Sequence, residues 1–279
     1  MKIALKGLGG RHPAAPPRAP DALRGLTLEV AQGEQLAVIG PSGAGKTTLL
    51  HLLACALRPS AGSLQLDGRD PWLLPRPQLH RLRGQLFLAP QVPPLPPRQR
   101  VVTAALAGRL PQIGLWQSLR SLFYPVGIAQ ADEALARFDL SDKLFDRVDR
   151  LSGGERQRVG LARALVAIDA GRDAADETAS VGATSPSAGP PQARRAPSGG
   201  SAAHEVASVG ATLLLVDEPL SALDPTRAAQ AVASLTGAAR ERGATLVATL
   251  HHVEMALAHF PRILGLRDGE LAFDLPASQ

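Results

Sequence analysis

The chain has 279 residues, a length that accommodates one large domain or two small ones. Hydrophobic residues make up 45% of it and charged residues 20%, as is typical of globular proteins. A single cysteine, Cys55, excludes an intramolecular disulfide framework. The formal net charge of +5 permits a nucleic acid or an anionic surface as partner without requiring either. No apolar run reaches the roughly 18 residues of a membrane span, and no signal peptide is recognisable, so we expect a cytoplasmic protein.

The first 90 residues predict strands, a glycine-rich loop and one helix. Residues 23–39 indicate two short strands around a turn at Gln32-Gly33. After the loop, the apolar stretch 47–57 predicts a helix, which ends before an Arg-Pro pair. Residues 63–89 suggest further strands, with Asp67-Gly68 as a hairpin turn.

The middle of the chain is helical in pattern and then loses its large apolar side chains. Helices are expected over 101–110, 115–123 and 131–138. Residues 170–210 are mainly Ala, Ser, Gly and Pro, which is typical of disorder. The hexapeptide ASVGAT occurs twice near this stretch, at 179–184 and 207–212, which indicates a local duplication. We therefore expect a low-complexity, disordered insertion.

The last 68 residues or so alternate again between strand and helix patterns. A buried strand, TLLLV, precedes the pair Asp217-Glu218, and a second strand is expected over 245–252. Helices are expected after each of them, and a final hairpin at Asp268-Gly269. Strands that alternate with helices in this way predict an α/β fold with a mainly parallel sheet.

A phosphate-binding loop is the first chemical signal. Residues 40–48, GPSGAGKTT, match the pattern G-x-x-x-x-G-K-[ST] between a predicted strand and a predicted helix. Glycines let successive backbone N–H groups face one phosphate, and the N-terminus of the helix attracts the same anion. Lys46 would reach the β- and γ-phosphates, and the hydroxyl of Thr47 would ligate Mg²⁺.

Two further motifs follow. Asp217 ends a buried strand and would hold Mg²⁺ through water, while Glu218 could polarise a water aimed at the γ-phosphate. The sequence LSGGERQRVGLARAL at 151–165 places Ser152 before a long helix, with Glu155 in its first turn. That pattern fits a second anion-binding helix end, and equally an ordinary N-cap.

GPSGAGKTT, LSGGERQ and LLLVDEP occur in the order found in ABC-transporter ATPase subunits, which this chain strongly resembles. The resemblance runs from about residue 3 to 275, apart from the insertion. It implies a P-loop NTPase fold with a RecA-like core, a mainly parallel sheet, an antiparallel β-subdomain and an inserted α-helical subdomain. We expect one ABC ATPase domain over 1–279. The core with its β-subdomain would comprise 1–90 and 211–279, the helical subdomain 91–166, and the insertion 170–210.

The resemblance also implies roles for single residues. Gln91 resembles the Q-loop glutamine, which contacts Mg²⁺ and the attacking water. Asp224 resembles the D-loop aspartate, and His251 the switch histidine that hydrogen-bonds the γ-phosphate, with His252 as a competing candidate. Catalysis would thus depend on Glu218, His251 and Gln91, and Mg²⁺ on Thr47, Gln91 and Asp217. The expected nucleotide contacts are Gly40, Pro41, Ser42, Gly43, Ala44, Gly45, Lys46, Thr47, Thr48, Ser152, Gly153, Gly154, Asp224 and His12.

His12 departs from the family pattern. Members usually stack adenine on an aromatic residue near this place, and imidazole should stack more weakly. A second departure follows Gln91, where VPPLP forms an unusually stiff connection.

The family mechanism implies partners. Two ATPase subunits would enclose two ATP molecules head to tail, so that Ser152, Gly153 and Gly154 of one complete the site of the other. A membrane permease would dock on the helical subdomain at the cytoplasmic face of the inner membrane. An extracytoplasmic substrate-binding protein would take part indirectly, and nucleic acid is not expected.

The region 115–150, with its Leu-Trp pair, and the pattern T-L-H-x-V-x-x-A-L from Thr249 are similar to phosphonate-importer ATPase subunits. We expect import of phosphonate or a related oxyanion. Other importers, lipoprotein-release or export systems, and a soluble non-transport ABC ATPase are the alternatives. A regulatory subunit without hydrolysis is disfavoured because Glu218 and His251 are both present.

Overall fold

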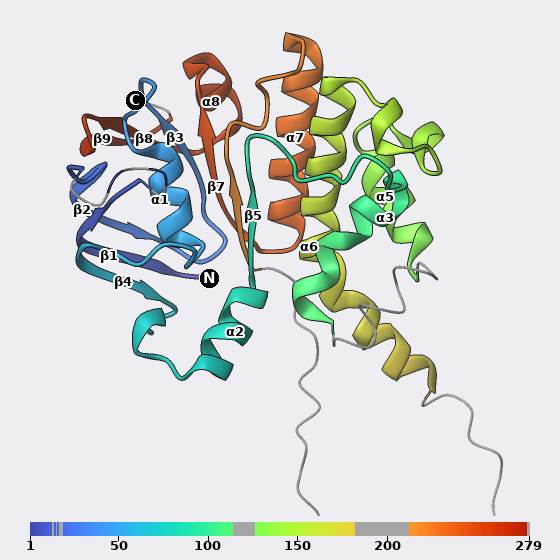
Figure 1. Ribbon diagram of the computed structural model, residues 1–279, viewed down its shortest axis with the longest axis horizontal. Coiled ribbons are helices and arrows are strands. Elements are labelled where there is room, and N and C mark those ends of the chain that lie inside the picture. The colour runs from blue at the N-terminus through green and yellow to red at the C-terminus, as the bar shows by residue number, and fades with distance from the viewer. Residues whose placement is uncertain (13, 15, 17–18, 114–125, 182–211, 278–279) are drawn as a thin grey trace, which may run out of the picture.

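The computed structural model shows a six-stranded sheet with helices on one face and a smaller three-stranded sheet beyond the other (Figure 1). It describes residues 1–12, 14, 16, 19–113, 126–181 and 212–277, with the side chains of 171–181 excepted.

The described strands have between four and eight residues each. They are β1 (Ile3–Gly10), β2 (Leu23–Val30), β3 (Gln35–Ile39), β4 (Ala61–Leu66), β5 (Leu86–Ala89), β6 (Leu213–Val216), β7 (Thr245–Leu250), β8 (Arg262–Arg267) and β9 (Glu270–Pro276).

The described helices lie mostly between β5 and β7 in the chain. The α-helices are α1 (Lys46–Leu53), α2 (Arg76–Gly84), α3 (Val101–Leu106), α5 (Ile128–Ala136), α6 (Gly153–Val181), α7 (Pro225–Glu241) and α8 (Val253–His259). Short 3₁₀ turns are η1 (Pro71–Leu73), η2 (Ala107–Gln112), η3 (Ser141–Lys143) and η4 (Val148–Arg150).

The large sheet has the order β5-β6-β7-β3-β8-β9, and only its edge strand β9 runs antiparallel to its neighbour. Its central strands are buried on both faces, as expected of a parallel sheet covered on both sides. Alternate residues enter different cores. Leu214 and Val216 face the core with α3, α5, α6 and α7, whereas Leu213 and Leu215 face the core with α1 and the small sheet.

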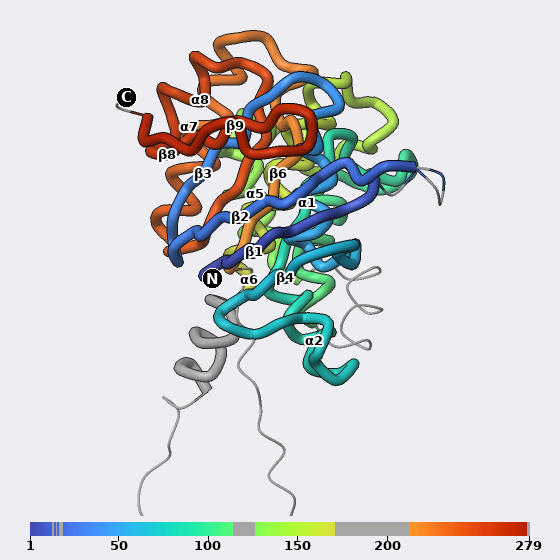
Figure 2. Tube along the Cα trace, turned by 90° about the vertical axis from the view of Figure 1, so that its left-hand side faces the viewer, coloured from blue at the N-terminus to red at the C-terminus, as the bar shows by residue number. Residues whose placement is uncertain are grey.

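The small sheet, β2-β1-β4, is fully antiparallel and lies across α1 from the large sheet (Figures 1 and 2). Its inward side chains, among them Ile3, Leu28 and Leu64, share one core with Leu49 and Leu52 of α1. The predicted α/β fold, with its mainly parallel sheet and separate antiparallel sheet, is confirmed.

Two expectations for local structure were partly wrong. Residues 63–89 contain the last four residues of β4 and the strand β5, with helix α2 between the two strands. Pro75 and Pro77 flank the first residue of this helix. Asp67 and Gly68 do form a tight turn with φ of 48° and 75°, but no second strand follows it. The final hairpin at Asp268-Gly269 is confirmed between β8 and β9.

Helix α6 extends further than the sequence predicted. It continues to Val181, so the first twelve positions of the expected disordered insertion are helical. The other positions from 182 to 210 lie outside the described residues, as does the expected helix over 115–123. Within the described parts of the chain, no helix is long and apolar enough to cross a membrane.

Arg262 on β8 joins the large sheet to the small one. Its Nε and Nη2 donate to the two carboxylate oxygens of Asp274 at 2.7 and 2.6 Å. Its Nη1 donates to the backbone oxygen of Glu29 at 2.9 Å and to Glu34 Oε1 at 2.8 Å. These bonds raise the pKa of the guanidinium above its ordinary value, against the effect of burial.

Replacing Arg262 with Met should therefore lower the free energy of unfolding by about 2 kcal/mol, since two carboxylates lose their shared donor. Urea unfolding measures this. The matched control is Arg240→Met on α7, an exposed arginine that forms no ion pair among the described residues, with an expected loss under about 0.5 kcal/mol. Equal losses in the two variants would contradict the assignment.

Candidate active site

Four neighbouring parallel strands end at the same edge of the large sheet, and each is followed by a predicted site segment. The phosphate loop follows β3, Gln91 follows β5, Asp217-Glu218 follow β6, and His251 follows β7. The strands β5, β6, β7 and β3 are consecutive neighbours with parallel registers. Segments distant in sequence must therefore meet here, at the carboxyl edge where α/β proteins bind ligands.

The phosphate loop requires glycine at its two motif positions. Gly45, with φ of 96°, precedes α1, and a Cβ there would lie 2.6 Å from the carbonyl oxygen of Ala22. Gly40 has φ of 156°, and its Cβ would collide with the carbonyl of Leu266. Because no described side chain caps the N-terminus of α1, its free N–H groups are available to an anion.

Lys46 is the cation of this loop. Only 5% of the residue is exposed, and Nζ donates to the carbonyl oxygens of Gly40 at 2.8 Å and Pro41 at 3.1 Å. The same ammonium lies 3.9 Å from Glu218 Oε1. Lys46 thus links the backbone of its own loop to the carboxylate of Glu218.

Glu218 is the point where the segments converge. Gln91 Nε2 donates to Glu218 Oε2 at 2.8 Å, and His251 Nε2 lies 2.5 Å from Glu218 Oε1. His252 makes no contact with this carboxylate among the described residues and does not line the pocket beside Lys46, although it lines a neighbouring hollow together with Glu218 and His251. The geometry thus favours His251 over His252 as the histidine of the site.

The backbone at Glu218 is strained, and a hydrogen bond to Thr249 stabilises it. Its φ of 44° lies in the left-handed region, which is unfavourable for a residue with a side chain. Thr249 on β7 stabilises this arrangement, because its Oγ1 accepts from Glu218 N at 2.9 Å and donates to Asp217 Oδ1 at 2.7 Å. Asp217 and Thr249 are 5% and 0% exposed, so the bond between them is buried, and the bond from Glu218 N is partly buried.

A pocket of about 590 Å³ gathers most of the predicted residues. This volume suits a nucleotide-sized ligand. The lining residues are His12, Ala22, Ser42, Gly43, Gly45, Lys46, Thr47, Thr48, Gln91, Glu218 and His251. The exposed His12 lies at its rim, where the sequence placed the base.

The pocket fits a triphosphate on four observations. A buried cation and a free helix N-terminus face it, and Gly43, with φ of 81°, leaves open space for an approaching anion. The buried hydroxyl of Thr48 has no hydrogen-bond partner among the described residues, so a polar group is left for a ligand to satisfy. Asp217, however, does not line the pocket.

Among the predicted residues that do not line this pocket, Gly40, Pro41 and Ala44 belong to its phosphate loop, whereas Ser152, Gly153, Gly154 and Asp224 lie on other segments. Ser152 precedes α6 and forms a capping box, with Glu155 N donating to Ser152 Oγ and Ser152 N donating to Glu155 Oε2 at 2.7 Å. The backbone N–H of Ser152, and after it the Ser152 hydroxyl, hold the pKa of the Glu155 carboxyl below its usual value. Asp224 caps α7 by accepting from Arg227 N at 3.0 Å. Gly154 packs beside Ala222, so both segments share one surface of the chain.

Thr249 is the residue that sequence reasoning missed as a functional one. The available signal was a polar side chain in an otherwise apolar buried strand, two positions before His251.

Replacing Thr249 with Val should lower the free energy of unfolding by about 2 kcal/mol, because a buried carboxylate and a buried N–H lose their partner. ATP hydrolysis should fall about tenfold or more as Glu218 loses its support. Thr249→Ser should retain both properties. Thr236→Val, at a buried threonine that bonds its own helix backbone, is the control for activity. Full activity of Thr249→Val would refute the role given to this hydroxyl.

Comparison with known proteins agrees with the site. The family model for ABC transporters matches residues 23–169. The phosphonates import ATP-binding protein PhnC of Polaromonas sp. strain JS666 is 68% identical over 279 residues, covering 100% of this chain and 86% of that protein. PhnC 2 of Albidiferax ferrireducens is 63% identical, with the same shares of 100% and 86%.

Solved structures agree on the fold. A dimeric bacterial ABC transporter cassette matches with a TM-score of 0.70 at 22% identity, covering 99% of this chain and 98% of that one. An ATP-binding cassette in a post-hydrolysis state, bound to ADP and Pi, matches with a TM-score of 0.69 at 21% identity over the same shares. With relatives this similar along its whole length, the chain belongs to the ABC transporter family, as one of its ATPases.

Proposed function

We propose that this chain hydrolyses ATP to power the import of phosphonate through a membrane permease. The observation that carries the proposal is the convergence of Lys46, Gln91 and His251 on Glu218 inside one pocket. The substrate is supported by the relatives named as phosphonates import ATP-binding proteins, at 68% and 63% identity. No further candidate function is favoured by the geometry.

Hydrolysis follows from an exchange of partners around Glu218. Both of its carboxylate oxygens are occupied within the chain, one by Gln91 and one by His251. An arriving γ-phosphate would draw Lys46 and His251 onto its own oxygens, since a multiply charged phosphate is the stronger acceptor. One oxygen of Glu218 is then free to accept a hydrogen bond from a water beside Gln91. As the water oxygen bonds to the γ-phosphorus, one of its protons passes to the Glu218 carboxylate and the bond to the β-phosphate oxygen breaks. ADP and phosphate leave, and Glu218 releases the proton to phosphate or solvent.

Mg²⁺ would neutralise charge on the β- and γ-phosphates. We assign Thr47 and Gln91, which line the pocket, to hold it, and Asp217 to hold it through water. The side chain of Asp217 is already oriented by Thr249. The other nucleotide contacts would come from the loop 40–48, with His12 beside the adenine.

The site of a single chain is incomplete in this proposal. Ser152, Gly153, Gly154 and Asp224 lie away from the pocket. A second ATPase subunit, placed head to tail, would bring its own copy of these residues to the γ-phosphate. The solved cassette of the same fold is described as dimeric. Two chains would thus share two ATP molecules.

The assembly would lie at the cytoplasmic face of the inner membrane, held there by the permease. An extracytoplasmic substrate-binding protein would deliver phosphonate to the other side, and nucleic acid has no part. The domain division proposed from sequence stays, with the helical subdomain ending within α6. The described chain resumes at Thr212, directly before β6 begins at the edge of the sheet opposite Glu218.

Growth with a phosphonate as the sole phosphorus source tests the function in the native host lacking this gene. Wild-type chain and His252→Ala should restore growth, whereas Glu218→Gln and His251→Ala should not, because these two lose the polarising carboxylate and the γ-phosphate contact. Uptake of labelled phosphonate measures transport directly, and immunoblotting checks that all variants are present.

Normal uptake in the strain without the gene would refute the phosphonate assignment. Restoration by His251→Ala with failure of His252→Ala would overturn the choice of histidine. Loss of phosphonate efflux, with uptake unchanged, would indicate an exporter instead.

A further inference from the structure

The segment after Gln91, Val92–Pro97, runs along the side of helix α6 and is called the proline strap here. It contains prolines at 93, 94, 96 and 97. Proline fixes the backbone φ, so a displacement at one point of the strap is transmitted to its neighbours. The far end is anchored to η4's first turn, where Asp149 N donates to the carbonyl oxygen of Pro97 at 2.9 Å.

Gly160 of α6 is the seat of the strap. A Cβ at this position would lie 2.5 Å from Pro93 Cγ and 2.8 Å from Pro93 Cβ, distances that real contacts do not reach. The ring of Pro93 thus occupies the volume that a side chain at 160 would fill. Pro93 is only two residues from Gln91, with a stiff connection between them.

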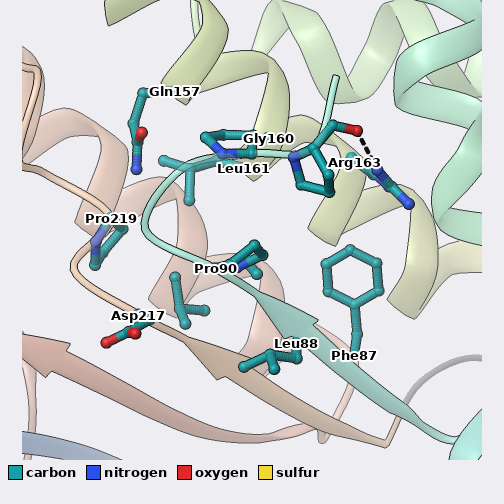
Figure 3. A pocket seen from close by; sticks show the side chains of 13 residues that line it. Phe87, Leu88, Pro90, Gln157, Gly160, Leu161, Arg163, Asp217 and Pro219 are labelled. Carbon is teal, nitrogen blue, oxygen red and sulfur yellow. Dashed lines mark hydrogen bonds between the residues drawn. The ribbon is translucent and has the colours of Figure 1, made fainter. Parts of the chain in front are cut away.

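Arg163, one turn further along α6, holds the next residue of the strap. Its Nη1 donates to the carbonyl oxygen of Pro94 at 3.4 Å, drawn as a dashed line in Figure 3. Burial lowers the pKa of this guanidinium, and Arg163 forms no ion pair among the described residues. Gly160 and Arg163 therefore present one face of α6 to Pro93 and Pro94.

The sheet below the strap gives it little support. A cavity of about 60 Å³ separates Pro93 and Pro94 from the ends of β5 and β6, with Leu88, Pro90 and Asp217 on its floor (Figure 3). A void leaves its lining without packing partners on one side. Pro93 and Pro94 meet Gly160 and Arg163 of α6, while the adjacent Leu95 packs against the hydrophobic core.

We propose that Gly160 and Arg163 are positioning residues for ATP hydrolysis, which seat the proline strap on α6 and thereby set Gln91 opposite Glu218. The inference rests on the proposed role of Gln91 in hydrolysis. It adds that the position of Gln91 relative to the Glu218 carboxylate depends on Gly160, a glycine of helix α6. Because α6 begins at Gly153, the same rigid helix carries Ser152–Gly154 at one end and the strap seat about 10 Å along it.

Gly160→Ala in the full chain tests this, because it adds one methyl group to the seat. We expect kcat for ATP hydrolysis to fall at least tenfold. The KM and the equilibrium affinity for a fluorescent ATP analogue should stay within twofold, since Lys46 and the phosphate loop are untouched. The thermal unfolding midpoint should stay or rise, because alanine favours a helix over glycine.

The matched control is Gly237→Ala in α7, a helical glycine where a Cβ would meet nothing within 4 Å. It should keep the kcat of the wild type. In the double variant Pro93→Gly/Gly160→Ala the ring no longer meets the methyl group, so part of the lost kcat should return. Arg163→Met should lower kcat with KM unchanged, as the second hold on the strap is lost.

The outcomes distinguish a failure of the proposed ATPase function from a failure of the role given to Gly160 and Arg163. An assembled transporter with the wild-type chain that shows no ATPase activity would refute the proposed function itself. An active wild type together with wild-type kcat in Gly160→Ala would overturn the inference alone. The inference also fails if Gly237→Ala loses as much kcat as Gly160→Ala, or if the loss in Gly160→Ala appears in ATP affinity instead of kcat.

Discussion

Every part of this site depends on the parallel register of β5, β6, β7 and β3. Parallel neighbours deliver their carboxyl ends to one edge, so the residues that follow them meet although they are up to about 200 positions apart in the chain. The carboxylate of Glu218 lies where these ends meet and is contacted from three of the other segments. Hydrophobic cores on both faces of the sheet hold this geometry before any ligand arrives.

The site is built under constraint. Glu218 adopts a left-handed backbone conformation, and the hydroxyl of Thr249 both accepts from its N–H and orients Asp217. Lys46, Gln91 and His251 all contact this one carboxylate. In the proposed mechanism, a γ-phosphate that competes for these donors would free one carboxylate oxygen for the attacking water. ATP binding and activation of Glu218 would then be one exchange of hydrogen bonds.

The sequence predicted the local motifs well because each has its own physical signature. Glycines 40 and 45, the buried run before Asp217 and the hairpin at Asp268-Gly269 are all fixed by steric or periodic rules. Helix α2 was missed because its residues are all at least partly exposed and give no apolar period. Thr249 and Gly160 were missed because their roles depend on partners distant in sequence, which no pattern around them indicates.

A structure of the full-length Glu218→Gln variant with ATP and Mg²⁺ tests the central claim most directly. The account predicts that Lys46 Nζ leaves the carbonyl oxygens of Gly40 and Pro41 and contacts the β- and γ-phosphates, while His251 contacts the γ-phosphate. It also predicts Ser152 of a second copy across the same phosphate. Phosphates bound elsewhere, or an ammonium of Lys46 still held by its own loop with ATP in the pocket, would contradict the account.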